Sequence, residues 1–164
     1  MAKATARVVR FHKLGGPEVL QIDELPLPEP GKGEVRLKVK AIGLNRAEVM
    51  FRMGQYLEPP RFPAKNGYEA SGVVDAVGLD VEKSWLGRKV STIPAFSLNQ
   101  YGVYGDTAIV PVHAIAAYPE KLTTPCKWTN ARPIARVFSC TPVVDLRHGT
   151  CLALTRPSCV LLMA

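Results

Sequence analysis

The stretch "EVRLKVKAIGLNRAEVMFRMG", residues 34–54, decides the fold class because its hydrophobic period changes in the middle. In the first half, Val35, Leu37 and Val39 alternate with basic residues. Such alternation predicts a strand with one buried face and one solvated face. We expect this strand to end before Asn45, where the alternation stops.

The second half of the stretch predicts a short helix. Val49, Met50 and Met53 follow a helical spacing, and Gly54 stands where a helix commonly ends. Further apolar runs bounded by Gly, Pro or Asp predict the other strands. These runs read "ARVVRFH", "VLQIDELP", "EASGVVDAVG", "RKVSTIP" and "DTAIVPV". The sequence therefore predicts a mainly β domain, folded as a small barrel, with one or two short helices.

Length and composition fit one ordinary domain. The chain has 164 residues, of which 47% are hydrophobic, and a formal net charge of +7. The first residues, "MAKATARVVRF", contain no apolar segment of the kind a signal peptide needs. The sequence contains no run of about 18 apolar residues, so it predicts no membrane span. We therefore expect a cytoplasmic protein with no membrane contact.

The composition changes near residue 120. Residues 1–120 carry 15 basic and 13 acidic residues, whereas residues 121–164 carry 6 and 1. The last segment has one glycine, Gly149, and it holds all four cysteines, namely Cys126, Cys140, Cys151 and Cys159. We expect one folded domain over residues 1–122 and a basic tail over residues 123–164.

The tail fits no pattern of a known site. Its cysteines lie 14, 11 and 8 residues apart, which matches neither a zinc finger nor, in a cytoplasmic chain, a disulfide framework. Its basic residues are dispersed, which argues against nucleic-acid binding. Enrichment in Arg, Pro, Ser, Thr and Cys without periodicity favours a truncated or out-of-frame extension, irregular and poorly structured.

Four blocks of the sequence, taken in order, carry a resemblance to a known family. They read "PGKGEVRLKVKAIGLNRAEVMFRMGQY", "GYEASGVVDAVG", "GRKV" and "YGVYGDTAIVPVHAIAAYPEKL". Together they resemble the N-terminal GroES-like domain of the medium-chain dehydrogenase/reductase superfamily, most closely its quinone oxidoreductase branch. The likeness covers about residues 5–122.

The resemblance implies a site without catalytic zinc. In zinc-dependent relatives a His occupies the place of Tyr68, and a Cys ligand lies just before the helix, where this chain has Leu44 and Asn45. Residues 1–120 contain no cysteine, and their two histidines lie away from the ligand positions. Zinc needs a set of His, Cys or carboxylate ligands, which Glu69 alone does not supply.

The resemblance places two residues at the substrate and the cofactor. The Asn45 amide would face a nicotinamide or a substrate carbonyl, and the Tyr56 hydroxyl would donate to a substrate oxygen. Each residue also has a plainer interpretation. Asn45 fits a helix cap paired with Glu48, its side chain accepting from an early helix amide, and Tyr56 fits a half-buried loop tyrosine.

The residues around the start of the next strand have a structural interpretation. We interpret Tyr68 as a packing residue rather than a proton donor. Glu69 is expected to be partly buried and to need a partner, for which Arg52 is a candidate. Gly67 and Gly72 fit a tight turn and a close-packing position.

The resemblance implies the substrate-side domain of an NADPH-dependent, zinc-independent oxidoreductase that reduces a small quinone or a carbonyl compound by hydride transfer. Relatives hold NADPH on a second domain with a glycine-rich turn, so no cofactor is expected to bind this chain alone. The alternative is a non-enzymatic β-barrel module, either an inactive remnant or an interaction domain. A shifted reading frame that restored a glycine-rich unit after residue 122 would favour the reductase.

Overall fold

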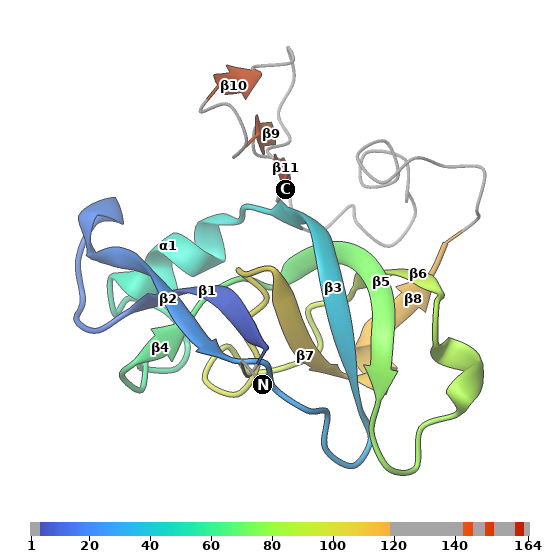
Figure 1. Cartoon of the computed structure of the whole chain (residues 1–164). Helices are drawn as coiled ribbons and strands as arrows, with labels where there is room; N and C mark the ends of the chain where they lie inside the picture. Colours follow the sequence, from blue (N-terminus) through green and yellow to red (C-terminus); the bar gives the residue numbers. More distant parts are fainter. Residues whose placement is uncertain (1–3, 119–142, 146–149, 153–159, 163–164) are drawn as a thin grey trace.

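The computed structural model describes residues 4–118, 143–145, 150–152 and 160–162 (Figure 1). The helix is α1 (Arg46–Arg52), and short 3₁₀ turns lie at Pro17–Val19, Lys83–Trp85 and Val112–Ala114. The strands are β1 (Thr5–Phe11), β2 (Leu20–Pro26), β3 (Glu34–Gly43), β4 (Ala64–Lys65), β5 (Glu69–Val77), β6 (Lys89–Thr92), β7 (Thr107–Pro111), β8 (Ile115–Ala117), β9 (Val143–Asp145), β10 (Thr150–Leu152) and β11 (Val160–Leu162). The predicted mainly β class is confirmed.

The strands form two sheets. The smaller has the order β2-β1-β4, and the larger has the order β10-β9-β11-β3-β5-β6-β8, with β7 also paired to β3. Among the described residues this pairing does not return to its first strand, so the expected barrel is not closed by hydrogen bonds. Within residues 4–118, β7 and β8 do not pair with each other; between them Pro111 has no N–H to donate and the turn Val112–Ala114 redirects the chain.

Strand β3 occupies the centre of the larger sheet, as Figure 1 shows. It pairs with β5 from Val35 to Gly43 and with β7 over Glu34–Lys38. The alternation that predicted this strand is confirmed, because its apolar positions are buried in the main core cluster. That cluster contains Val35, Leu37, Val39, Ile42, Ala70, Val74, Val90, Val103, Tyr104, Ala108, Val110 and Ile115.

Helix α1 forms where it was predicted, but its buried face is not the one that carries the predicted apolar residues Val49 and Met53. Glu48, Phe51 and Arg52 are buried, whereas Val49 is 39% exposed and Met53 is 44% exposed. Phe51 packs in a second core cluster with Phe11, Val19, Ala64 and Leu98. The helix thus turns a carboxylate and a guanidinium inward, and they need polar partners there.

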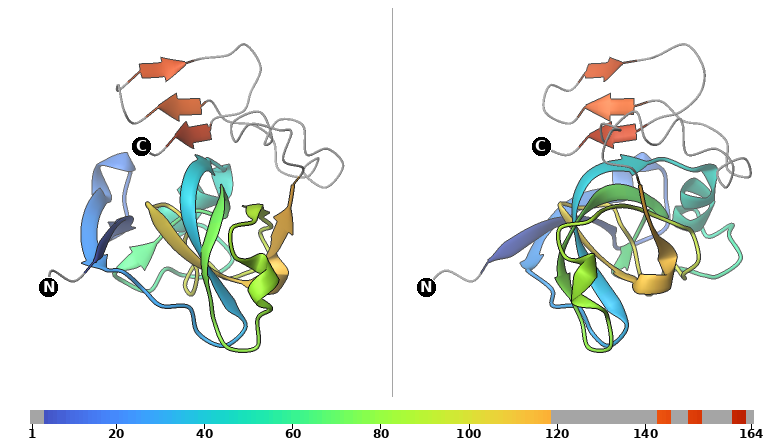
Figure 2. Two further views of the ribbon diagram at one scale, coloured as in Figure 1. Left: turned by 45° about the vertical axis from the view of Figure 1, so that its right-hand side comes forward. Right: turned by 90° about the vertical axis from the view of Figure 1, so that its right-hand side faces the viewer.

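Three short strands lie within the segment that was predicted to be an irregular tail. β11 runs antiparallel to β3, with Val160 opposite Gly43, and parallel to β9. Figure 2 shows the three strands side by side beyond the end of β3. At these positions the chain forms strands, whereas the tail was expected to be irregular. The rest of residues 123–164 lies outside the described residues, so the predicted domain boundary stays a prediction.

Two glycines predicted from the sequence lie at close contacts. Gly67 has a φ of +99°, and a Cβ there would lie 2.2 Å from Cδ1 of Tyr104. At Gly72 a Cβ would lie 2.3 Å from the Lys38 carbonyl oxygen, in the β3–β5 pairing. Gly67 therefore meets two constraints at once, since a side chain would be strained by its backbone and would also overlap a buried ring.

The substitution Gly67→Ala tests these two constraints against a matched control. Gly33 also has a positive φ, +73°, but nothing lies within 4 Å of its Cβ position. Gly33→Ala should therefore cost only the backbone strain, about 1–3 kcal/mol. Gly67→Ala should cost about 1–3 kcal/mol more through overpacking against Tyr104. Urea unfolding measures both, and equal losses would contradict the packing argument.

Candidate functional site

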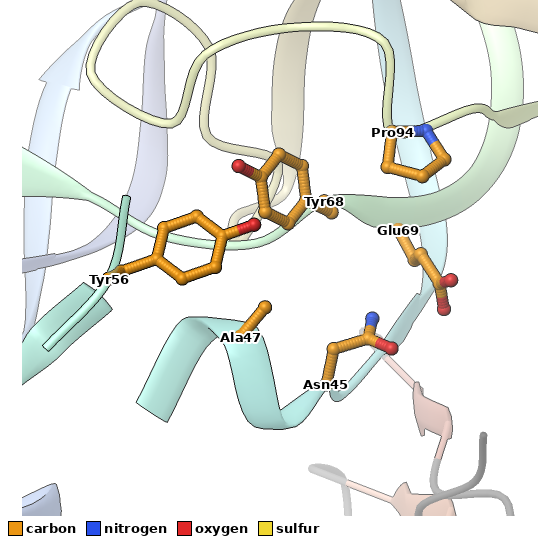
Figure 3. A pocket seen from close by; sticks show the side chains of 6 residues that line it. All are labelled: Asn45, Ala47, Tyr56, Tyr68, Glu69 and Pro94. Carbon is orange, nitrogen blue, oxygen red and sulfur yellow. The ribbon is translucent and has the colours of Figure 1, made fainter. Parts of the chain in front are cut away.

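Four residues that the sequence singled out line one pocket. Asn45 lies at the start of α1, Tyr56 follows the helix, and Tyr68 and Glu69 lead into β5 (Figure 3). Ala47 and Pro94 complete the lining, and the pocket holds about 340 Å³ including the space open to solvent. The predicted residues Gly67 and Gly72 are not among the lining residues.

Glu48 organises this site, although its side chain is not in the lining. It is 2% exposed and accepts hydrogen bonds from the Asn45 N–H (2.5 Å), the Tyr68 N–H (2.9 Å) and the Tyr104 hydroxyl (2.5 Å). Burial raises the pKa of Glu48, while these hydrogen bonds act in the opposite direction. The helix cap is thus made chiefly by the Glu48 carboxylate on the Asn45 N–H. The capping pair in the sequence was the available signal for Glu48, and none pointed to Tyr104.

Tyr68 is anchored through its backbone as well as through its ring. Its N–H donates to Glu48, and its carbonyl accepts from the Thr92 hydroxyl at 2.8 Å. The ring contacts Tyr56 and Phe96, with centroids 6.3 Å and 5.6 Å away. Burial, and then the hydrogen bond with the Tyr56 hydroxyl, raises the pKa of Tyr68. The phenol therefore stays protonated, able to donate or to accept.

Glu69 does not have the partner expected from the sequence. Within residues 4–118 no ion pair joins it to Arg52, whose guanidinium donates instead to the Gly15 carbonyl oxygen at 3.1 Å. Arg52 lies one helical turn beyond Glu48, at the end of α1 remote from Asn45, and it is not among the residues that line the pocket. The candidate pairing of Glu69 with Arg52 is therefore wrong.

The carboxyl of Glu69 is instead buried beside neutral groups. It is 6% exposed. Burial raises its pKa to about 7, while the Asn45 amide lowers it and the nearby Glu48 raises it further. Figure 3 shows the Asn45 and Glu69 side chains directed toward one another across the pocket. A carboxyl with this pKa is about half protonated at neutral pH and largely protonated at pH 6.

The described residues offer little to a metal ion. They contain no group of three or more His, Cys, Asp or Glu side chains that could hold one. His12 contacts Asp23 at 3.3 Å, and His113 lies in the turn Val112–Ala114, so neither belongs to the pocket lining. No helix among the described residues is long and apolar enough to cross a membrane.

The pocket fits one side of a nicotinamide ring. An amide and two phenols are neutral partners of the kind that a carboxamide needs, and they surround the small side chain of Ala47. The one α-helix of the described part of the chain, α1, follows Gly43, Leu44 and Asn45 rather than a glycine-rich turn. Among the described residues, therefore, no glycine-rich turn and helix N-terminus are present to hold the pyrophosphate of such a cofactor.

Residues 31–120 match the family described as the alcohol dehydrogenase GroES-like domain, and the chain belongs to that family. The quinone oxidoreductase of Salmonella typhimurium is 42% identical over 112 residues, which cover 66% of this chain and 34% of that protein. The chain thus spans about a third of that relative's length. These matches confirm the predicted resemblance to the quinone oxidoreductase branch of the medium-chain dehydrogenase/reductase superfamily.

Two solved structures show the same fold. The human synaptic vesicle membrane protein VAT-1 homolog-like protein has a TM-score of 0.66 and 30% identity, covering 74% of this chain and 38% of that one. A mycobacterial protein solved in complex with NADPH has a TM-score of 0.62 and 29% identity, covering 72% of this chain and 35% of that one. A nicotinamide cofactor is thus bound by a structural relative.

The raised pKa of Glu69 predicts a specific dependence of stability on pH. Between its ordinary value of 4.5 and about 7 the folded chain keeps a proton that the unfolded chain has lost. The free energy of unfolding should therefore fall as pH rises through this window, by about 3 kcal/mol in total. Glu69→Gln, which cannot ionise, should match the parent at pH 4.5 and exceed it by up to this amount at pH 8.

Urea unfolding at pH 4.5 and pH 8 measures this difference. Glu24→Gln is the matched control: Glu24 is exposed on β2 and the variant keeps Glu69, so it should lose stability between the two pH values as the parent does. A stability difference between Glu69→Gln and the parent that is the same at both pH values would contradict the prediction.

Proposed function

We propose that residues 1–122 form the substrate-side domain of an NADPH-dependent, zinc-independent oxidoreductase that reduces a small quinone or a conjugated carbonyl compound. The supporting observation is a pocket lined by one amide, two phenols and one carboxyl, with no cationic side chain in the lining. Such a lining offers hydrogen bonds to a carbonyl oxygen and ring faces to a planar acceptor. A relative named quinone oxidoreductase supports the same substrate class.

Each lining residue has a part in this proposal. Asn45 holds the nicotinamide carboxamide or the acceptor oxygen, and Tyr56 donates its hydroxyl proton in a hydrogen bond to that oxygen. Tyr68 flanks the acceptor with its ring and orients the Tyr56 hydroxyl through their mutual hydrogen bond. The cofactor supplies the hydride when bound. The residues of this chain would orient the acceptor carbon for that transfer.

A non-enzymatic GroES-like module is the second candidate. It is supported by the likeness to a protein whose name is not that of an oxidoreductase, the human VAT-1 homolog-like protein. The two candidates differ in one property. A reductase domain should select a quinone ring in the pocket around Tyr56, whereas a module has no reason to do so.

The zinc-independent proposal predicts no metal at the pocket. Glu69 is the one carboxyl in the lining, with no His or Cys beside it, and zinc needs three such protein ligands for a catalytic site. Elemental analysis of the purified, reduced chain should find the same zinc content in the parent and in Glu69→Gln. Stoichiometric zinc that is lost in Glu69→Gln would overturn the assignment.

The substrate class predicts that a quinone binds at Ala47. Duroquinone suits the test because its four methyl groups block addition of cysteine thiols. Titration at pH 6 should shift the ¹³C-methyl resonance of Ala47 and leave that of Ala6, buried on β1, unchanged. Tyr56→Phe should weaken binding by about two- to tenfold, the effect of one lost neutral hydrogen bond.

Tyr101→Phe is the matched control for this titration. The Tyr101 hydroxyl donates to Glu34 at 2.7 Å, and Tyr101 is not among the residues that line the pocket. Its loss should leave duroquinone binding unchanged. If the Ala47 resonance does not move, or if both phenylalanine variants bind alike, the reductase proposal fails and the module is favoured.

A further inference from the structure

Glu69 is a buried acid in the pocket wall, and none of the roles given above uses it. We propose that Glu69 is held as a neutral carboxylic acid and donates first a hydrogen bond, and then its proton, to the oxygen of the quinone or conjugated carbonyl bound in this pocket. This inference rests on the proposed function. It makes Glu69 a catalytic residue where the sequence indicated a structural ion pair.

The backbone on both sides of Glu69 is fixed, which directs its side chain into the pocket. The Ala70 N–H donates to the Thr92 hydroxyl oxygen at 2.8 Å, and the same hydroxyl donates to the Tyr68 carbonyl at 2.8 Å. Glu69 itself stands opposite Gly43 in the β3–β5 pairing. The carboxyl is therefore presented by a strand rather than by a free loop, as a positioned proton donor requires.

Burial and the Glu48 carboxylate favour the neutral form of Glu69, while the Asn45 amide acts in the opposite direction. From α1 it faces the Asn45 amide and the Glu48 carboxylate, and from the loop before β7 the Tyr104 phenol. Tyr56 and Tyr68 share its pocket. These groups are neutral or negative, and in the described part of the chain no Lys, Arg or His pairs with Glu69. A second negative charge beside buried Glu48 would therefore be unfavourable.

The two neighbouring acids have different surroundings and so different roles. Glu48 is surrounded by donors, from Asn45, Tyr68 and Tyr104, and serves as an acceptor. Glu69 meets no such set of donors; it is one of the residues that line the pocket, and Figure 3 shows its carboxyl directed toward the Asn45 amide. Neighbouring acids whose hydrogen-bond surroundings differ in this way are a usual arrangement for acid catalysis.

The proton transfer balances with the proposed hydride transfer. A reduced nicotinamide cofactor, when bound, would supply a hydride to the carbon end of the conjugated system, and the electron pair of the carbonyl bond would then move onto oxygen. That oxygen forms a bond to the Glu69 proton, and the carboxyl O–H bond breaks. Glu69 is left as a carboxylate, which takes a proton from water at the pocket mouth. One hydride and one proton are then added to the acceptor.

The test measures the titration of the Glu69 carboxyl and the binding of duroquinone in two separate experiments on the full 164-residue chain. Glutamate labelled with ¹³C at the side-chain carboxyl reports the titration, and the resonance that is absent in Glu69→Gln identifies Glu69. We expect its midpoint at about pH 7. Duroquinone affinity, read from the Ala47 methyl resonance, should then be about tenfold weaker at pH 8 than at pH 6, because only the protonated acid donates.

Two variants separate the proposal from general effects of pH. Glu69→Gln keeps a neutral donor, so its affinity should be near that of the parent at pH 6 and should not change at pH 8. Glu24→Gln, on the exposed side of β2, should follow the parent at both pH values. The alanine methyl spectrum checks that each variant is folded.

Each outcome has a distinct meaning. A midpoint below pH 5.5, or parent binding that does not depend on pH, overturns the role of Glu69 while leaving the proposed function intact. A midpoint near pH 7 with no movement of Ala47 at either pH overturns the proposed function, and the role of Glu69 with it. A midpoint near pH 7 with the tenfold loss, abolished in Glu69→Gln, supports both.

Discussion

A single buried carboxylate holds the parts of this domain together. Glu48 receives donors from the start of α1, from the lead-in to β5 and from the loop before β7. Through Tyr104 it reaches the main core cluster, and through Tyr68 it reaches the second. Hydrogen bonds to a charged group contribute about 1.5–3 kcal/mol each, and removing their acceptor would leave several donors buried and unpaired. The pocket exists because these segments meet at Glu48.

This arrangement determines what the neighbouring acid can do. With its oxygens taken up by donors, Glu48 cannot contact a ligand, yet its charge influences Glu69. Glu69 therefore meets a negative neighbour and burial together, and both favour its protonated form. Phenols and an amide supply the remaining polarity of the pocket. The site resembles a set of neutral hydrogen-bond donors more than a charged binding site.

Local pattern predicted the elements, and tertiary contacts decided the rest. The alternation of Val35, Leu37 and Val39 identified β3, because a strand that buries one face has apolar residues at every second position. In α1 the same logic identified the helix but not its orientation, since Val49 and Met53 face solvent while Glu48 and Phe51 face inward. The cost of burying Glu48 is offset by Tyr104, 56 residues away, and no local pattern contains that contact. The prediction that Arg52 pairs with Glu69 was wrong for the same reason, because Arg52 contacts the distant Gly15 instead. The prediction of a closed barrel also depended on the path of the chain in the turn after Pro111, which no local pattern contains.

The double anchoring of Tyr68 has a consequence for how such a site can change over time. Its N–H and its carbonyl are held by Glu48 and Thr92, so the backbone at this position does not depend on which ring is attached. The codons of Tyr and His differ by one base. A single nucleotide change would therefore put an imidazole beside Glu69 without rebuilding the scaffold. Position 68 can thus exchange a phenol for an imidazole while the surrounding fold stays the same, which by itself supplies one of the three ligands that a catalytic zinc site needs.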